Sequence, residues 1–363
     1  MFNREEVRNL KYIVISGGTG GHIFPALSIS DKINKLNFKV ETYLGDVKIP
    51  LKTNSKYNTF ELFKTGGKNG FSVFKKIFQM GKFIMSLFLK GKGVKFSRNS
   101  IGLIFGAYFS FPWIIYFLLK KIPFVLLEQN VLPGRVNRLF ERFSLVNIGG
   151  LRFRSKRWIF CGVPLREFVF FKKRDAMRYL GIDWDGWVVG VMGGSQGALN
   201  LTEFMINYAK KHRNIFFLII VGKKNYEIFK NVNEPNVKIL DFVEDMSKFY
   251  SAVDFLICRA GALTIAEASF FGKPLIMIPY PYSKDNHQYY NAFYVQRKRG
   301  GILIEEKDLN DLKIEEAINK IAMDYDIYKK GISSINSAES YRCVLKEVNY
   351  NYFKKSRLKR CFI

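Results

Sequence analysis

The feature that most constrains this fold is an alternation of short apolar runs with helical segments, in which several apolar runs end at glycine-rich turns. The strand-like runs are KYIVIS, FKVETYL, TFELF, IGLIFG and PFVLLEQN in the first half, and WVVGVMGG, IFFLIIVG, VKILDFV, VDFLICRAG, PLIMIPYP and GILIEE in the second. Strands that alternate with helices form parallel, doubly wound sheets. The sequence therefore predicts an α/β protein with two Rossmann-like sheets in tandem and a ligand cleft between them.

The length of the chain allows two domains, each with its own core, since 48% of its 363 residues are hydrophobic. Gly and Pro in CGVPLR, residues 161–166, interrupt the pattern before a charged stretch. We therefore expect a first domain over residues 1–163 and a second over residues 164–340. A helix over residues 341–363 is expected to pack back on the first domain.

The net charge of +27 is distributed unevenly. Residues 1–163 carry 27 Lys and Arg against 8 Asp and Glu, whereas residues 164–342 carry 25 against 22. No acidic residue lies between Glu61 and Glu128. Nucleic acid and an anionic membrane leaflet are the two partners that such a basic half favours.

The segment FSVFKKIFQMGKFIMSLFLKGK, residues 71–92, places apolar side chains at helical spacing among lysines, as in a helix that lies in a lipid interface. A core helix with a solvated basic face explains the apolar stripe equally well, but the absence of acidic residues favours lipid. The uncharged run from Ile101 to Leu119 is long enough to suggest a membrane-spanning helix. Its glycines and Pro112 instead favour a buried strand, a turn and a core helix.

The four cysteines and three histidines show no metal-ligand spacing, so we expect reduced thiols, no metal and no other cofactor. The pair Asp183 and Asp185 is interpreted as part of a surface turn. The N-terminus contains no apolar secretory segment, which predicts a cytoplasmic protein.

Three glycine-rich turns follow predicted strands and precede predicted helices. They are residues 17–22 (GGTGGH, with a helix expected to open near Pro25), residues 193–198 (GGSQGA) and residues 259–267 (RAGALTIAE). Free amides at a helix N-terminus bind phosphate, so these turns predict a diphosphate site. A dinucleotide site is disfavoured because GxGxxG does not fit the first turn.

Three residues of these turns are of types that suggest chemical roles. Glu267 can accept both hydroxyls of a ribose, although an acid that complements the helix dipole is the alternative. His22 lies in a glycine-rich loop at the head of a helix and is the candidate general base, with an acceptor-orienting loop residue as the alternative. Ser195 fits both an N-cap and a phosphate contact.

Five segments together resemble the MurG family of N-acetylglucosaminyltransferases: GGTGGHIFPAL, LEQNVLPGRVNRL, GGSQGALN, RAGALTIAEASFFGKPLIMIPYP and KDNHQYYNA. That resemblance runs from Tyr12 to about Ile304 and implies the GT-B architecture. It implies an inverting transfer of N-acetylglucosamine from UDP-N-acetylglucosamine to lipid I, which forms lipid II with a β-1,4 linkage. It also implies peripheral attachment to the cytoplasmic side of the inner membrane and a place in a cell-wall synthesis complex.

The resemblance assigns roles residue by residue. Val243 and Arg166 would meet the uracil, Glu267 the ribose, and Ser195 with the turn Ala262, Leu263, Thr264, Ile265, Ala266 and Glu267 the diphosphate. Asn130, His287 and Gln288 would reach the sugar. Thr19, Gly20 and Gly21 would line the acceptor side, with His22 as the base.

The chain departs from the family pattern at four positions, where Leu127, Val163, Ala107 and Phe111 replace a usual His, Asn and two glycines. The sequence therefore matches the family less well at the acceptor site than at the donor site. The alternatives are another lipid glycosyltransferase of the same architecture, such as a diacylglycerol glucosyltransferase, and a scaffold without catalysis. A nucleic-acid-binding protein would explain the charge but not the diphosphate turns.

Overall fold

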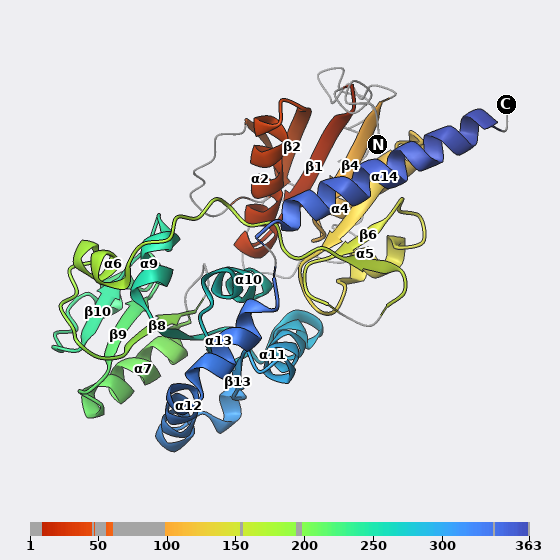
Figure 1. Cartoon of the computed structure of the whole chain (residues 1–363). Coiled ribbons are helices and arrows are strands. Elements are labelled where there is room, and N and C mark those ends of the chain that lie inside the picture. The colour runs from red at the N-terminus through yellow and green to blue at the C-terminus, as the bar shows by residue number, and fades with distance from the viewer. Residues whose placement is uncertain are drawn as a thin grey trace, which may run out of the picture. The chain divides into compact units, whose positions relative to one another are not determined.

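The computed structural model describes residues 9–45, 47, 56–60, 99–152, 155–193, 198–336 and 338–361. The described chain divides into two compact units (Figure 1). Unit 1 comprises Met1–Gln129, Pro133–Arg166 and Glu339–Ile363, and unit 2 comprises Asn130–Leu132 and Glu167–Ala338. The basic segment over residues 71–92 and the turn residue Ser195 lie outside the described residues.

Unit 1 contains a parallel seven-stranded sheet in the order β3-β2-β1-β4-β5-β6-β7. Its strands are β1 (Lys11–Gly17), β2 (Lys39–Gly45), β3 (Tyr57–Phe60), β4 (Ser100–Ile104), β5 (Phe124–Glu128), β6 (Asn147–Gly149) and β7 (Trp158–Phe160). The register pairs Lys11 with Lys39 on one side of β1 and with Ser100 on the other. The chain order reverses between β1 and β4, and ligands of such sheets bind at this switch point, at the carboxyl ends of the strands.

Helices cover both faces of this sheet. On one face α2 (Gly20–Lys35) and α14 (Ser340–Cys361) share a core with β1, β4 and β5. On the other face α4 (Ser110–Leu119) and α5 (Arg135–Phe140) pack around the fully buried Trp113. The uncharged run at 101–119 therefore forms a core strand, a turn and a core helix, as predicted, and none of the described helices is both long and apolar enough to span a bilayer.

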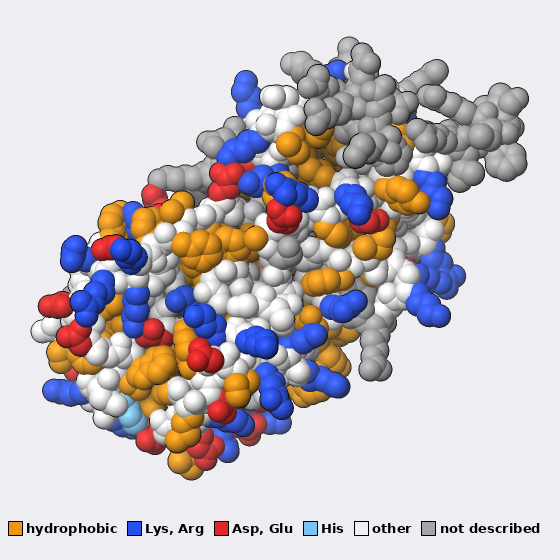
Figure 2. Space-filling view, in the orientation of Figure 1, with side chains coloured by type: hydrophobic (Ala, Val, Ile, Leu, Met, Phe, Trp, Pro, Cys, Tyr) orange, Lys and Arg blue, Asp and Glu red, His pale blue; other side chains and the backbone are white. Residues whose placement is uncertain are grey.

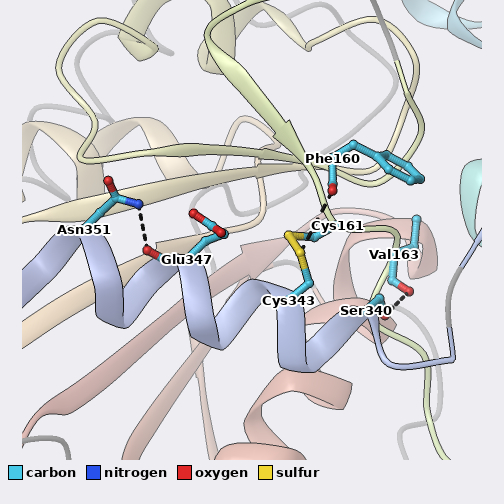
Figure 3. The surroundings of a disulfide bond; sticks show 7 residues. All are labelled: Phe160, Cys161, Val163, Ser340, Cys343, Glu347 and Asn351. Atoms are coloured by element: carbon cyan, nitrogen blue, oxygen red, sulfur yellow. Dashed lines mark hydrogen bonds between the residues drawn. A yellow bond between two sulfur atoms is a disulfide. The ribbon is translucent and has the colours of Figure 1, made fainter. Parts of the chain in front are cut away.

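A disulfide joins the two distant parts of unit 1. Cys161, which follows β7, is bonded to Cys343 near the start of α14, across a sequence separation of 182 residues (Figure 3). Beside it the hydroxyl of Ser340 donates to the carbonyl of Val163 at 2.9 Å. The prediction of four reduced thiols is wrong for this pair, because the 5.4 Å between the two Cα atoms results from the docking of α14, which cysteine spacing does not reveal.

Unit 2 contains a parallel six-stranded sheet in the order β10-β9-β8-β11-β12-β13. Its strands are β8 (Val188–Met192), β9 (Phe216–Ile220), β10 (Val237–Leu240), β11 (Phe255–Cys258), β12 (Leu275–Met277) and β13 (Gly301–Leu303). Its helices are α6 (Lys173–Tyr179), α7 (Leu199–Lys211), α8 (Tyr226–Phe229), α9 (Met246–Ala252), α10 (Ala262–Phe271), α11 (His287–Arg297), α12 (Asp311–Met323) and α13 (Tyr325–Ser333), with short 3-10 turns at Lys284–Asn286 and Glu306–Asp308. Helices α7 and α12 share a core with β8, β9, β11 and β12. The predicted class of two Rossmann-like parallel sheets is confirmed.

One predicted helix boundary is wrong. Helix α2 begins at Gly20 rather than near Pro25, so Pro25 is its sixth residue. A proline at that depth removes only the hydrogen bond to the carbonyl of Gly21, and the helix continues to Lys35. His22 is therefore a residue of the first helical turn.

Candidate functional site

The first candidate half-site lies at the carboxyl ends of β1, β4 and β5 in unit 1. The turn after β1 passes through Gly18, with φ at +87°, and Thr19, the exposed N-cap of α2. Gly17 has no space for a side chain, because a Cβ there would lie 2.8 Å from Cβ of Phe109. The amides of Gly20 and Gly21 belong to the first turn of α2, where backbone N–H groups have no intrahelical acceptor.

His22 is fixed by a side chain from another strand end. Its Nδ1 lies 2.7 Å from Oε1 of Gln129, the residue that follows β5. An amide oxygen can only accept, so the neutral ring in this contact carries its hydrogen on Nδ1 and keeps the lone pair of Nε2. The ring also lies beside the loop after β4, since a Cβ on Gly106 would be 3.7 Å from Cε1 of His22.

The loop after β4 keeps its left-handed backbone despite the departure from the family pattern. Gly106 has φ at +66° and Ala107 has φ at +64°. Phe111, the other replacement, packs against Phe140 of α5 with ring centroids 5.5 Å apart. Ala107 therefore stands at a left-handed position that favours glycine, and Phe111 makes an aromatic contact with α5.

The second candidate half-site lies at the carboxyl ends of β8 and β11 in unit 2, on either side of that sheet's switch point. The turn after β8 needs glycine at Gly193, because a Cβ there would lie 2.3 Å from the backbone nitrogen of Ala198. The turn after β11 ends at Gly261, the N-cap of α10. The amides of Ala262, Leu263 and Thr264 form the first turn of α10, the type of backbone that binds phosphate.

Glu267 is a residue of the second turn of α10 and is only 3% exposed. The hydroxyl of Tyr250 on α9 donates to its Oε2 at 3.0 Å. The favourable effect of a helix dipole on an acid falls off within the first turn, so the dipole does not explain a carboxylate at this depth. The carboxylate of Glu267 is thus a buried acceptor that a phenol helps to orient, and a carboxylate can accept several hydrogen bonds, including those of a ligand hydroxyl group.

A buried ion pair anchors the turn that leads into α10. The guanidinium of Arg259 makes two 3.0 Å hydrogen bonds to the carboxylate of Glu306 and also donates to the carbonyl of Ile278. The preceding Cys258 is fully buried, and burial raises the pKa of its thiol to about 12. This turn therefore has a rigid base and an unreactive thiol.

The predicted sugar-binding residues are also in unit 2. Asn291, which is fully buried on α11, donates to Oδ1 of Asn130 at 3.0 Å and to the carbonyl of Ala260 at 3.1 Å. The Nδ1–H of His287 donates to the carbonyl of Lys284, and the side-chain oxygen of Gln288 accepts from the amide of Tyr280. Asn291 thus ties the segment of Asn130 to the turn after β11.

The remaining predicted contacts are divided between the units. Val243 is half-buried in the segment between β10 and α9 of unit 2. Arg166 belongs to unit 1, where its guanidinium lies 5.1 Å from the ring centroid of Phe24. Asp183 and Asp185 are exposed in a turn before β8, and the described residues contain no cluster of acidic, His and Cys side chains suited to a metal.

Sequence reasoning missed three residues that hold the site, namely Gln129, Tyr250 and Asn291. Gln129 lies inside the LEQN motif between two residues that were considered, so the motif carried a signal for it. Asn291 likewise lies inside the KDNHQYYNA segment, so that motif also carried a signal. Tyr250 acts through a contact between α9 and α10, which nothing in its local sequence marks.

Comparison with known proteins extends across both units. Residues 12–145 match the glycosyltransferase family 28 N-terminal domain, and residues 188–341 match the glycosyltransferase family 28 C-terminal domain. Several relatives carry the name UDP-N-acetylglucosamine–N-acetylmuramyl-(pentapeptide) pyrophosphoryl-undecaprenol N-acetylglucosamine transferase, among them one from Sulfurihydrogenibium sp. and one from Caldanaerobacter subterraneus subsp. tengcongensis. The one from Sulfurihydrogenibium sp. is 30% identical over 90% of this chain and 92% of its own length. The one from Caldanaerobacter subterraneus subsp. tengcongensis is 33% identical over 85% of this chain and 90% of its own length.

A solved structure supports the fold. The crystal structure of MurG from Acinetobacter baumannii superposes with a TM-score of 0.66 at 19% identity, covering 94% of this chain and 99% of that chain. Both matched domains together span well over half of the chain, and relatives at or above 30% identity cover most of it. The chain belongs to the MurG family of glycosyltransferases, within glycosyltransferase family 28.

Proposed function

We propose that this glycosyltransferase moves N-acetylglucosamine from UDP-N-acetylglucosamine to the muramoyl pentapeptide of lipid I, which yields lipid II. The observation that carries the proposal is the 30% and 33% identity, over 90% and 85% of this chain, to two relatives that bear that transferase name. Each half-site supplies one requirement of the reaction. Unit 1 supplies a base and unit 2 supplies a diphosphate-binding helix N-terminus.

In unit 1 the reaction needs a group that takes the proton of the acceptor 4-hydroxyl. Nε2 of His22 has a lone pair available because Nδ1 donates to Gln129. As the O–H bond breaks and the N–H bond forms, the oxygen attacks the anomeric carbon and the bond to UDP breaks on the opposite face. Attack from the opposite face inverts the configuration from α to β. Thr19, Gly20 and Gly21 would line the acceptor.

In unit 2 the reaction needs groups that stabilise the negative charge of the leaving diphosphate. Amides of the first turn of α10 and of the turn after β8, together with Ser195, would bind its oxygens, and one well-aimed donor in a comparable site contributes about 2.7–4 kcal/mol. Glu267 would bind the ribose, and Val243 and Arg166 the uracil. Asn130, His287 and Gln288 would bind the sugar.

The test is a transfer assay with labelled UDP-N-acetylglucosamine and lipid I. The His22→Ala variant should lower kcat by about 10²- to 10⁴-fold while donor affinity stays unchanged. His212→Ala is the matched control, because His212 is the C-cap of α7 and its ring stacks on Tyr208 at 3.9 Å. Wild-type turnover in His22→Ala would remove His22 as the base. Transfer to diacylglycerol in place of lipid I would overturn the acceptor assignment.

The same proposal places the chain on the cytoplasmic surface of the inner membrane. Unit 1 exposes Leu119 at the end of α4 and Leu139 and Phe143 at the end of α5, with Lys120, Lys121, Arg138 and Arg142 beside them in sequence. On the face drawn in Figure 2, Lys and Arg side chains are interspersed with hydrophobic ones. Apolar side chains among basic ones favour an anionic lipid surface.

Vesicle sedimentation tests this part of the proposal. The protein should bind vesicles that contain phosphatidylglycerol more strongly than vesicles of phosphatidylcholine alone, and added salt should weaken the binding. Replacing Leu139 and Phe143 with Ser should weaken the binding to vesicles that contain phosphatidylglycerol. Equal binding to both vesicle types, or salt-sensitive binding to DNA instead, would contradict the membrane assignment.

A further inference from the structure

We infer that Gln129 is a positioning residue that fixes the tautomer and orientation of the His22 imidazole. This inference rests on the proposed function of His22 as the base. It starts from the 2.7 Å contact between Nδ1 of His22 and Oε1 of Gln129, which connects residues 107 positions apart in the sequence. Because the amide oxygen lacks a hydrogen, the contact selects the tautomer in which Nε2 is unprotonated.

Gln129 can hold the ring because its own position is fixed. Its side chain is 3% exposed, and a Cβ on the neighbouring Gly150 would lie 3.1 Å from its Cα. The preceding Glu128 accepts hydrogen bonds from the amide of Gly134 at 2.8 Å and from Nδ2 of Asn137 at 2.9 Å. The end of β5 is therefore tied to α5 and β6 before it meets His22.

The loop after β4 passes beside the imidazole. A Cβ on Gly106 would lie 3.7 Å from Cε1 of His22, so this glycine is a neighbour of the ring. The hydrogen bond to Gln129 is the contact that orients the ring plane. A catalytic base that must meet a hydroxyl group within hydrogen-bond distance needs such a fixed plane, and a small misplacement costs about 10²-fold in rate.

The neutral character of Gln129 gives the contact a specific consequence. An amide orients the ring but does not neutralise the imidazolium that forms when the proton is taken, whereas a carboxylate would do both. The charged residue next to Gln129 in the chain, Glu128, hydrogen-bonds to the amide of Gly134 and to Asn137 of α5. Exchanging the amide for a carboxylate therefore changes the charge beside His22 while keeping an acceptor for Nδ1.

The experiment compares two variants of the full-length protein in the lipid I transfer assay. Gln129→Met keeps the size of the side chain but removes the acceptor, and it should lower kcat by about 10²-fold with little change in KM for UDP-N-acetylglucosamine. Gln129→Glu should retain most of kcat and move the acidic limb of the pH–rate profile upward by about one unit, because the carboxylate stabilises the imidazolium. A purely structural role for Gln129 would not produce that shift.

Two controls separate this inference from the function on which it rests. Gln296→Met removes another side-chain amide, whose oxygen accepts from the backbone of Leu303 at 2.8 Å, and should leave kcat unchanged. In the double variant His22→Ala/Gln129→Met, kcat should equal that of His22→Ala alone, since Gln129 acts only through His22. Melting temperature and donor calorimetry establish that each variant folds.

The outcomes are distinct. Wild-type kcat in Gln129→Met, together with a large loss in His22→Ala, overturns the positioning role and leaves the proposed function intact. A loss in Gln129→Glu as deep as in Gln129→Met overturns the tautomer assignment, because it means that the amide donates to Nδ1. Wild-type kcat in His22→Ala overturns the base itself.

Discussion

Unit 1 and unit 2 contain the same kind of parallel sheet but are held together by different means. Unit 1 is assembled from both ends of the chain, and the Cys161–Cys343 disulfide and the buried residues Val344 and Val348 fix α14 to it. Unit 2 is nearly continuous in sequence and contains a buried cation, Arg259, which pairs with the half-buried Glu306. The comparison indicates that reductant should change the stability of unit 1 and that pH should change the stability of unit 2.

The largest expected effect is that of reductant on unit 1. Opening a covalent loop of this length increases the entropy of the unfolded chain, and loss of a native disulfide costs about 2–5 kcal/mol. Dithiothreitol should therefore lower the unfolding temperature of unit 1 and speed hydrogen exchange of the α14 amides. Scanning calorimetry with hydrogen-exchange mass spectrometry measures both.

The double variant Cys161→Ala/Cys343→Ala is the control for this prediction. It should behave like the reduced protein and should not respond to dithiothreitol. The transition of unit 2 should be the same in all samples. Identical exchange of α14 with and without reductant in the natural sequence would show that the helix is held by its apolar contacts alone.

The second prediction concerns Lys273, which follows α10 in unit 2. Its Nζ donates to the carbonyl of Val253 at 2.7 Å, and burial lowers the pKa of Lys273 to about 8, while Asp254 raises it and Lys173 and Lys329 lower it further. A depressed lysine pKa means that between about pH 8 and 10.5 the unfolded chain binds more protons than the folded one. The free energy of unfolding contributed by this group therefore rises across that window by about 3 kcal/mol.

Lys273→Met isolates that contribution. The difference in the free energy of unfolding between the natural sequence and this variant should grow in favour of the natural sequence from pH 8 to pH 10.5. Lys313→Met, at an exposed ion pair with Glu316, is the matched control. Its difference in the free energy of unfolding from the natural sequence should not change over this pH range. A flat difference for Lys273→Met as well would mean that the lysine stays charged in the folded unit.

The third prediction compares the two half-sites through donor binding. Glu267→Ala should weaken binding of UDP-N-acetylglucosamine by about 1.5–3 kcal/mol, through loss of a hydrogen bond to a charged group. Tyr250→Phe should weaken donor binding by about 0.5–1.5 kcal/mol, because it removes the hydrogen bond that orients the Glu267 carboxylate but keeps the carboxylate itself. His22→Ala should leave donor affinity unchanged. Titration calorimetry distinguishes these cases, with Glu227→Ala, at an exposed position of α8, as the control. Unchanged affinity in Glu267→Ala would refute the ribose contact.

The same comparison shows what could be predicted from the sequence. The alternation of apolar runs predicted both parallel sheets, because the period of buried side chains is a local property. The Cys161–Cys343 bond and the His22–Gln129 contact could not be predicted, because each depends on packing between segments more than a hundred residues apart. The predicted start of α2 near Pro25 was wrong because proline is favoured at the first position of a helix but also occurs inside one, as Pro25 does here.

The smallest expected effect concerns Ala107 in the loop after β4. Its φ of +64° lies in the left-handed region, where the Cβ of an alanine comes too close to the following carbonyl oxygen. A glycine has no Cβ and avoids this contact. Ala107→Gly should therefore stabilise unit 1 by roughly 0.5–1 kcal/mol, after allowance for the larger entropy of unfolded glycine. Ala322→Gly, in the last turn of α12, should have the opposite sign, because its backbone is helical. Chemical denaturation of both variants measures the pair. If Ala107→Gly destabilises unit 1 as much as Ala322→Gly destabilises unit 2, the alanine methyl makes contacts that outweigh the strain. In that case packing of the Ala107 methyl contributes more to the stability of the loop than the left-handed backbone costs.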